Sequence, residues 1–69
     1  MPREAKATLS AAGITVGQDF ASLTPEQIAA VRTEAAAAYH LKHGKPLPKP
    51  ERETYVRKRY DLLQRRARS

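Results

Sequence analysis

The sequence has no cysteine and no tryptophan, and it contains only three glycines and one phenylalanine. Without cysteine there is no disulfide, no thiol nucleophile and no cysteine-ligated zinc site, and the composition suits a reducing compartment. The glycines stand at positions 13, 17 and 44, a spacing that fits neither G-x-x-x-x-G-K-[ST] nor G-x-G-x-x-G. A nucleotide-binding loop of either kind is therefore not indicated.

Long apolar runs are also missing. The uncharged stretches are short and alanine-rich, well below the about 20 apolar residues that a membrane-spanning helix needs. The first ten residues, MPREAKATLS, lack the apolar segment of a signal peptide. The last third is basic but too poor in Trp, Phe and Leu for a typical interfacial helix. We therefore expect a cytoplasmic protein with no membrane partner.

No group of residues forms a recognisable catalytic or metal site. His40 and His43 are three positions apart near a predicted helix end, but no cysteine or nearby carboxylate completes a metal site. Histidines in the last turn of a helix more often interact favourably with the negative end of the helix dipole. Ser10, Ser22 and Thr24 lack a neighbouring base and are expected in turns and caps. We predict a non-enzyme with no cofactor and no metal.

The 69 residues are enough for one small domain, 1–69, with a limited core. Charge is unevenly distributed along this chain. Residues 1–39 carry three basic and four acidic side chains, a net charge of −1. Residues 40–69 carry ten basic and three acidic side chains, a net charge of +7. Segregated positive charge favours a polyanion or an acidic protein surface as partner, because it raises the encounter rate and adds affinity through counterion release.

The best-defined helix is predicted over 25–43. Thr24 is a strong N-cap, Pro25 suits the first helical position, and Gln27 completes a capping box. Gly44 is expected to end the helix. Its core stripe is formed by Ile28, Val31, Ala35, Ala38 and Tyr39, and a weaker seam nearly opposite by Ala30, Ala37 and Leu41. Because alanines on two sides let helices approach closely, we expect this helix to be the central one, with a homodimer contact as the alternative use of the second seam.

Two further helices complete a predicted all-α, three-helix domain. The first is expected over about 2–12 and the last over 50–68. The segment 13–24 is expected to be irregular, with Asp19 capping a single turn. The connector 44–49 is stiffened by prolines, which restrict the residues before them to extended backbone.

The last helix carries two stripes at helical spacing. The first is apolar and suited to docking on the rest of the domain, and consists of Val56, Tyr60, Leu63 and Ala67. The second alternates arginine with larger apolar groups, and consists of Tyr55, Arg59, Leu62 and Arg66. Most of the remaining circumference is basic, and Asp61 is expected to pair with Arg57 or Arg65 along the helix.

A helix that lies on a phosphate backbone or in a groove presents this kind of surface, since guanidinium groups bind phosphate or guanine and apolar groups contact sugar and base. The alternative is a solvated face whose arginine stems cover the apolar groups. We predict a non-catalytic nucleic-acid-binding protein, regulatory or architectural, for DNA or RNA. The predicted contacts are Lys42, Lys45, Lys49, Arg52, Tyr55, Lys58, Arg59, Leu62, Arg65, Arg66 and Arg68.

Two other functions fit the same pattern. One is a small protein-binding modulator or inhibitor that docks its basic helix on an acidic surface of a larger protein machine, with Tyr55 and Leu62 as anchors. The other is a structural component of a ribonucleoprotein or virion assembly. The sequence does not distinguish DNA from RNA, because arginine serves both.

Overall fold

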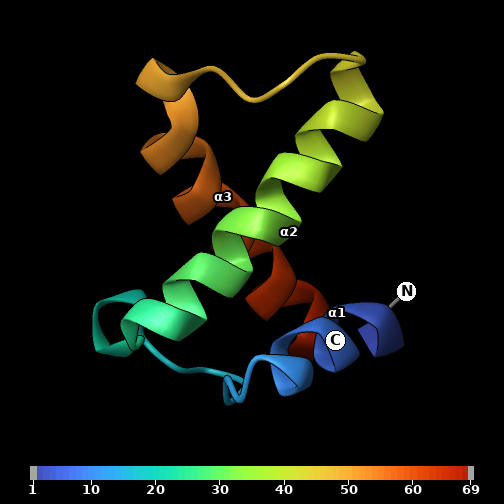
Figure 1. Ribbon diagram of the computed structural model, residues 1–69. Helices are drawn as coiled ribbons and strands as arrows, with labels where there is room; N and C mark the ends of the chain where they lie inside the picture. Colours follow the sequence, from blue (N-terminus) through green and yellow to red (C-terminus); the bar gives the residue numbers. More distant parts are fainter. Residues whose placement is uncertain (1, 69) are drawn as a thin grey trace.

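Helices make up nearly all of the secondary structure in the computed structural model, which describes residues 2–68 (Figure 1). Helix α1 spans Pro2–Ala11, α2 spans Pro25–His43 and α3 spans Arg52–Arg68. Single 3₁₀ turns lie at Phe20–Ser22 and Lys49–Glu51, and no strand occurs in the described part of the chain. The predicted all-α, three-helix fold is confirmed, with helix ends within two residues of the predicted ones.

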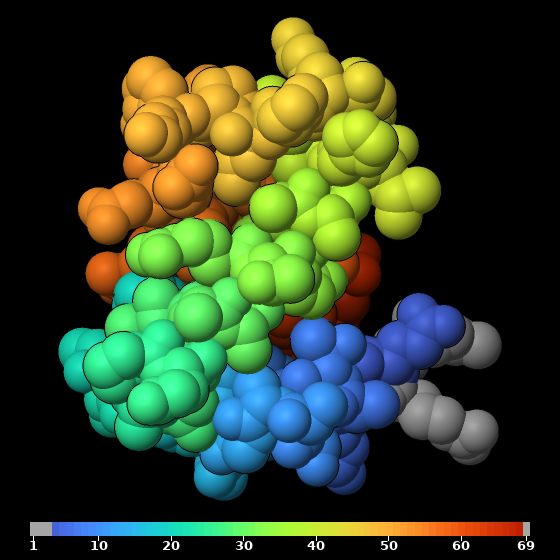
Figure 2. All heavy atoms as spheres, viewed as in Figure 1, coloured from blue at the N-terminus to red at the C-terminus, as the bar shows by residue number. Residues whose placement is uncertain are grey.

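The three helices form a flat body, whose Cα atoms extend 29 × 26 × 16 Å. In Figure 1, α2 crosses in front of α3, and α1 lies beside the C-terminal part of α3. The connector 44–49 joins the upper ends of α2 and α3, and Figure 2 shows it covering that end of the molecule. Both α1 and α2 pack against α3.

The central position therefore belongs to α3, and the prediction that the helix 25–43 is central was wrong. The reason lies in the size of the side chains. Helix α3 buries Val56, Tyr60 and Leu63, whereas α2 buries only Val31 and Ala35. The larger side chains of α3 provide enough apolar surface to pack against both α1 and α2. The small alanines of α2 provide enough to pack against α3 alone.

The core confirms the predicted apolar stripe of α3. Val56, Tyr60 and Leu63 are buried, and Ala67 packs against the core as a partly buried residue. Leu9 of α1 is 1% exposed, which makes it one of the two most deeply buried large side chains in the described part of the chain. The other buried apolar residues are Ala5, Ile14, Leu23, Val31, Ala35 and Leu47.

The start of α2 matches the predicted capping box. The backbone N–H of Gln27 donates to Thr24 Oγ1 at 3.1 Å, and the backbone N–H of Thr24 donates to Gln27 Oε1 at 2.9 Å. Gln27 also donates through Nε2 to the carbonyl of Gly13 at 2.9 Å, which ties the end of α1 to the start of α2. At the other end, Gly44 closes α2 with a φ of 70°, as predicted from its tolerance of the left-handed region.

The segment 13–24 contains the predicted single turn but not the predicted cap. The Asp19 side chain makes no cap hydrogen bond to the turn Phe20–Ser22. Instead, the backbone N–H and the hydroxyl of Ser22 both donate to the Asp19 carbonyl, at 3.0 and 2.7 Å. The turn is therefore closed through the backbone of Asp19, and its carboxylate stays exposed.

Candidate functional site

Helix α3 turns one side toward the core and the opposite side toward solvent. At 100° per residue, Lys58 and Arg65 lie opposite the buried stripe, and both are exposed. The exposed basic residues on this outward face are Arg57, Lys58, Arg65 and Arg68, while Arg66 is exposed on the flank that carries Arg59 and Leu62. Asp61 is the acidic residue among them. The structure thus keeps the basic part of α3 accessible along about three helical turns.

One flank of α3 is fastened to the segment 15–18 by a buried hydrogen-bond network. Gln64, only 6% exposed, accepts the backbone N–H of Gly17 at 2.6 Å through Oε1. Its Nε2 donates to the Thr15 carbonyl at 3.1 Å and to Tyr60 Oη at 2.9 Å. Tyr60 Oη in turn donates to the Gln18 carbonyl at 2.6 Å. Every polar group of the two side chains has a partner, so this flank is rigidly defined.

A shallow hollow opens beside this network. The guanidinium of Arg57 lies 4.8 Å from the centre of the Phe20 ring, a cation–π contact. The Phe20 ring meets Tyr60 edge-on with ring centres 5.3 Å apart. Arg65 and Arg68 line the same hollow, together with Asp19 and Asp61.

The predicted ion pair of Asp61 with Arg57 or Arg65 is not formed in the part of the chain that the structure describes. Arg57 instead stacks on Phe20, which lies far from it in the sequence. The Arg57–Phe20 contact is therefore found in place of the expected Asp61–Arg57 ion pair along the helix.

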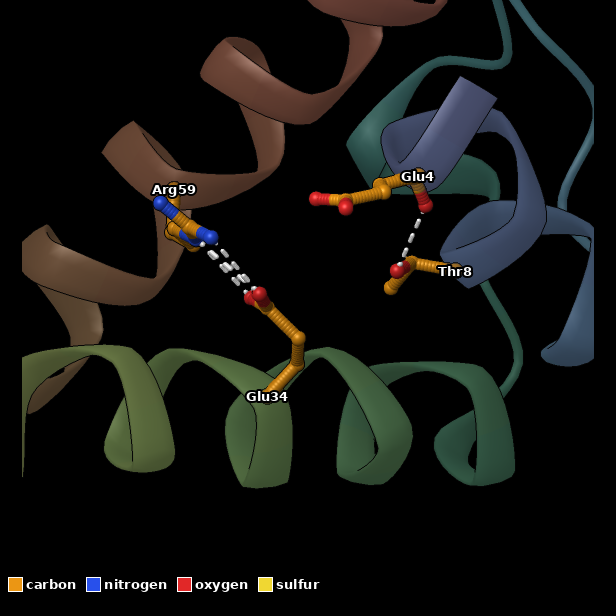
Figure 3. A network of polar contacts seen from close by, with 4 residues as sticks. All are labelled: Glu4, Thr8, Glu34 and Arg59. Atoms are coloured by element: carbon orange, nitrogen blue, oxygen red, sulfur yellow. Dashed lines mark hydrogen bonds and ion pairs between the residues drawn. The ribbon is translucent and has the colours of Figure 1, made fainter. Parts of the chain in front are cut away.

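The other flank of α3 is held to α2 by an ion pair between Arg59 and Glu34. Arg59 Nε donates to the two carboxylate oxygens at 2.9 and 3.2 Å, and Nη2 donates to Oε2 at 2.8 Å (Figure 3). The side chains are 20% and 25% exposed. The hydrogen bond to Glu34 raises the pKa of Arg59 above its ordinary value, against the opposing effect of partial burial.

This pairing changes the interpretation of Arg59, the first of the predicted phosphate contacts. The edge of its guanidinium formed by Nε and Nη2 is paired with Glu34 through two parallel hydrogen bonds. Arg59 therefore links α2 to α3. Reversing its charge would place two carboxylates together and weaken the fold, so it is a poor position for testing binding alone.

Beside this ion pair, the C-terminal part of α2 and residues 55–66 of α3 border an open groove. Its floor is apolar and consists of Ala38, Leu41, Tyr55 and Leu62. Lys42, Lys58 and Arg66 line it as well, so five of the predicted contacts meet here with Arg59. Leu41 is 87% exposed, the highest exposure of a large apolar side chain in the described part of the chain.

The remaining predicted contacts lie elsewhere. Lys45 and Lys49 are exposed on or next to the connector. Arg52 is half-buried and lines a separate hollow on the other side of α2, with Arg32, His40 and Leu47. Arg65 and Arg68 border the Phe20 hollow. The predicted residues therefore do not form one patch: they are distributed over both flanks of α3 and the connector.

The residues of the second α2 seam, Ala30, Ala37 and Leu41, are all exposed, and each borders a different depression of the surface. The homodimer contact that the seam suggested stays a prediction.

Three residues outside the predicted set shape the site: Glu34, Arg57 and Gln64. Gln64 sits at the edge of the apolar stripe of α3, which is a sequence signal for a half-buried polar group. Glu34 is an isolated carboxylate on an alanine-rich helix, and nothing in its spacing indicates Arg59 as its partner. Arg57 belongs to the basic face, but its stacking on Phe20 requires the fold.

Comparison with known protein families, with curated proteins and with solved structures finds no match. Of the helices that the structure describes, none combines the length and the apolar character that a membrane crossing requires. The function therefore has to be argued from the site alone.

Proposed function

We propose that the protein is a non-catalytic nucleic-acid-binding protein that holds a phosphate backbone against the outward face of α3. The observation that carries this proposal is the accessibility of four basic residues, Arg57, Lys58, Arg65 and Arg68, with the single acidic residue Asp61 among them. From residue 57 to residue 68 the helix rises about 17 Å at about 1.5 Å per residue. That length suits contacts with several consecutive phosphates.

The chemistry of this face favours phosphate contacts over base reading. No asparagine or glutamine is exposed on it, because Gln64 is buried and committed to the segment 15–18. Arginine and lysine bind phosphate oxygens without regard to sequence. The proposed binding is therefore largely independent of base sequence and strongly dependent on salt. Lys45 and Lys49 would extend the contact beyond the start of α3.

The test is binding to labelled duplex DNA, duplex RNA and single-stranded RNA over a series of salt concentrations. The informative variant is Lys58→Gln with Arg65→Gln, because both residues are exposed and lie opposite the buried stripe. The matched control is Lys6→Gln with Arg32→Gln, which removes two positive charges from exposed positions on α1 and α2.

We expect the wild type to bind with a steep decrease of log affinity with log salt. The Lys58 and Arg65 variant should lower this slope by about 2, since each lost phosphate contact removes about one counterion. The control variant should leave the slope nearly unchanged. Absence of binding at low salt, or equal losses in both variants, would refute the assignment to α3.

A further inference from the structure

The groove between the ends of α2 and α3 has features that the phosphate contact does not explain. Its floor is apolar, with Leu41 and Leu62 on facing helices and Tyr55 and Ala38 beside them. The proposed phosphate contact uses charged side chains of the outward face, and Leu41, which is 87% exposed, contributes little to the core. The groove is therefore a candidate for a second, different ligand.

The structure explains why this floor stays open within the chain. The Arg59–Glu34 ion pair joins α2 to α3, and Arg59 lies near the middle of the stretch of α3 that lines the groove. Farther along α2, the ring of Tyr39 meets the ring of Tyr55 edge-on, with ring centres 5.2 Å apart. Leu41 follows Tyr39 on α2 and Leu62 follows Arg59 on α3, so neither takes part in these two contacts, and both line the groove.

The charge around the groove restricts what can occupy it. Lys42 of α2 and Lys58 of α3 border the apolar floor, and both are exposed. Arg66 lines the same groove. No acidic residue is among the described residues that line it, and Glu34 is already paired with Arg59. The groove thus combines an apolar floor with a positively charged border, which is complementary to an acidic segment that carries apolar side chains.

A second copy of this chain is a poor occupant. A symmetric contact through the groove would bring Lys42 and Lys58 of one copy close to the same residues of the other, and like charges at a dimer interface are unfavourable. A nucleic acid would pair its phosphates with the lysines but offers fewer apolar groups to Leu41 and Leu62 than a protein helix does.

We infer that this groove binds an acidic amphipathic helix of a partner protein. The apolar side of that helix packs on Leu41, Tyr55 and Leu62, and its carboxylates pair with Lys42 and Lys58, a helix-in-groove arrangement. The lining residues of α3 extend from 55 to 66, about 17 Å at about 1.5 Å per residue, so a partner helix of about three turns fills the groove.

The experiment is selection of binders from a random library of displayed peptides of about 16 residues, followed by measurement of each peptide's affinity by fluorescence anisotropy. Every selected peptide is compared on the wild type, on Leu41→Ser and on Lys42→Gln. The matched controls are Ala30→Ser on the same helix and Lys45→Gln, both exposed and outside the groove. Circular dichroism checks that each variant remains folded.

The expected peptides have apolar residues at helical spacing and several Asp or Glu residues. Leu41→Ser should weaken their binding by about tenfold or more, as for a central apolar anchor. Lys42→Gln should weaken it less, with a reduced dependence on salt, and the two controls should have no effect.

Three results would overturn the inference. The first is a selection without enrichment. The second is enrichment of basic or purely apolar peptides, or of peptides that bind Leu41→Ser as well as the wild type. The third is a wild-type dimer that Leu41→Ser dissociates in analytical ultracentrifugation, because the occupant would then be a second copy. Lys58 borders the groove as well, but the phosphate proposal is tested on nucleic acid and needs neither Leu41 nor Lys42, so none of these results affects it.

Discussion

The two flanks of α3 are joined to the rest of the molecule in different ways. Toward the segment 15–18, Gln64 and Tyr60 are buried and their polar groups are fully paired. Toward the end of α2, one ion pair between Arg59 and Glu34 is followed by an open apolar groove. One flank therefore fixes the helix in place, and the other leaves surface available for a partner.

The difference follows from what each side of α3 meets. The Gln64 flank meets a segment of irregular backbone, whose N–H and C=O groups need partners once they are covered. The Leu62 flank meets the alanine-rich C-terminal part of α2, which has no polar backbone to satisfy and few large side chains to fill the space. The Gln64 flank therefore needs a specific hydrogen-bond network, whereas the Leu62 flank can leave a groove open without burying unpaired polar groups.

The largest effect is expected from Gln64→Leu. The substitution leaves the Gly17 N–H, the Thr15 carbonyl and Tyr60 Oη without their partner, and unpaired buried groups cost about 1–3 kcal/mol each. Since backbone groups of the segment 15–18 can partly bond to water instead, we expect a loss of about 2–4 kcal/mol in the free energy of unfolding. Urea denaturation measures it. The neighbouring exposed change Arg65→Leu is the control, and an equal loss there would contradict a special role for the network.

A smaller loss is expected from Gly17→Ala in the same segment. Gly17 has a φ of +91°, and an added Cβ would meet only Arg68 Nη2, at an ordinary 3.9 Å. The cost is therefore a backbone cost of about 1–2 kcal/mol, because L-residues avoid the left-handed region. Gly44→Ala, with a φ of +70° and open space around it, provides the comparison on the other side of the molecule. A larger loss at Gly44 in thermal unfolding would show that the Gly17 segment is less constrained than we describe.

On the opposite flank, Arg59→Met should cost about 1 kcal/mol. The methionine keeps much of the aliphatic stem but loses the paired hydrogen bonds to Glu34, and partly exposed ion pairs of good geometry contribute about this much. Because the pKa of Arg59 is raised on folding, the ion pair stabilises the fold fully below the ordinary pKa of arginine, and this stabilisation is lost only as the pH rises through the folded-state pKa. Chemical denaturation at about pH 7 and about pH 9 should therefore give the same difference from wild type; a difference that vanishes at the higher pH would be inconsistent with the ion pair.

The smallest effect is expected from Leu41→Ser. With 87% of the side chain exposed, its replacement should change the free energy of unfolding by no more than about 0.5 kcal/mol. Thermal unfolding by circular dichroism is sufficient to measure it. A clear destabilisation would mean that Leu41 belongs to the core, and the groove would lose its role as a binding surface.

The helices and the α3 core stripe were predictable because they depend on local signals. The capping residues Thr24 and Gln27 and the spacing of Val56, Tyr60 and Leu63 carry that information in the sequence itself. The pairing of Arg59 with Glu34 was not predictable, since it joins residues 25 positions apart and depends on how α2 crosses α3.

The candidate site was predicted in composition but not in arrangement. A helical projection places Arg59 and Leu62 on one face, but it does not show which of them meets a neighbouring helix. The structure assigns Arg59 to an internal contact and leaves Leu41 and Leu62 beside an open groove. It also assigns Arg57 to the face with Arg65 and Arg68, through the hollow that they share with Phe20.

The central claim is that α3 binds phosphate with the basic residues of its outward face and not with the apolar residues of the groove. The most direct measurement is a titration of the ¹⁵N-labelled protein with a short nucleic acid duplex, followed by heteronuclear NMR. The account predicts that the largest shifts cluster at Arg57, Lys58, Arg65 and Arg68, while Leu41 and its neighbours on α2 change little. Shifts centred on Leu41 and Leu62, or no shifts at low salt, would contradict it.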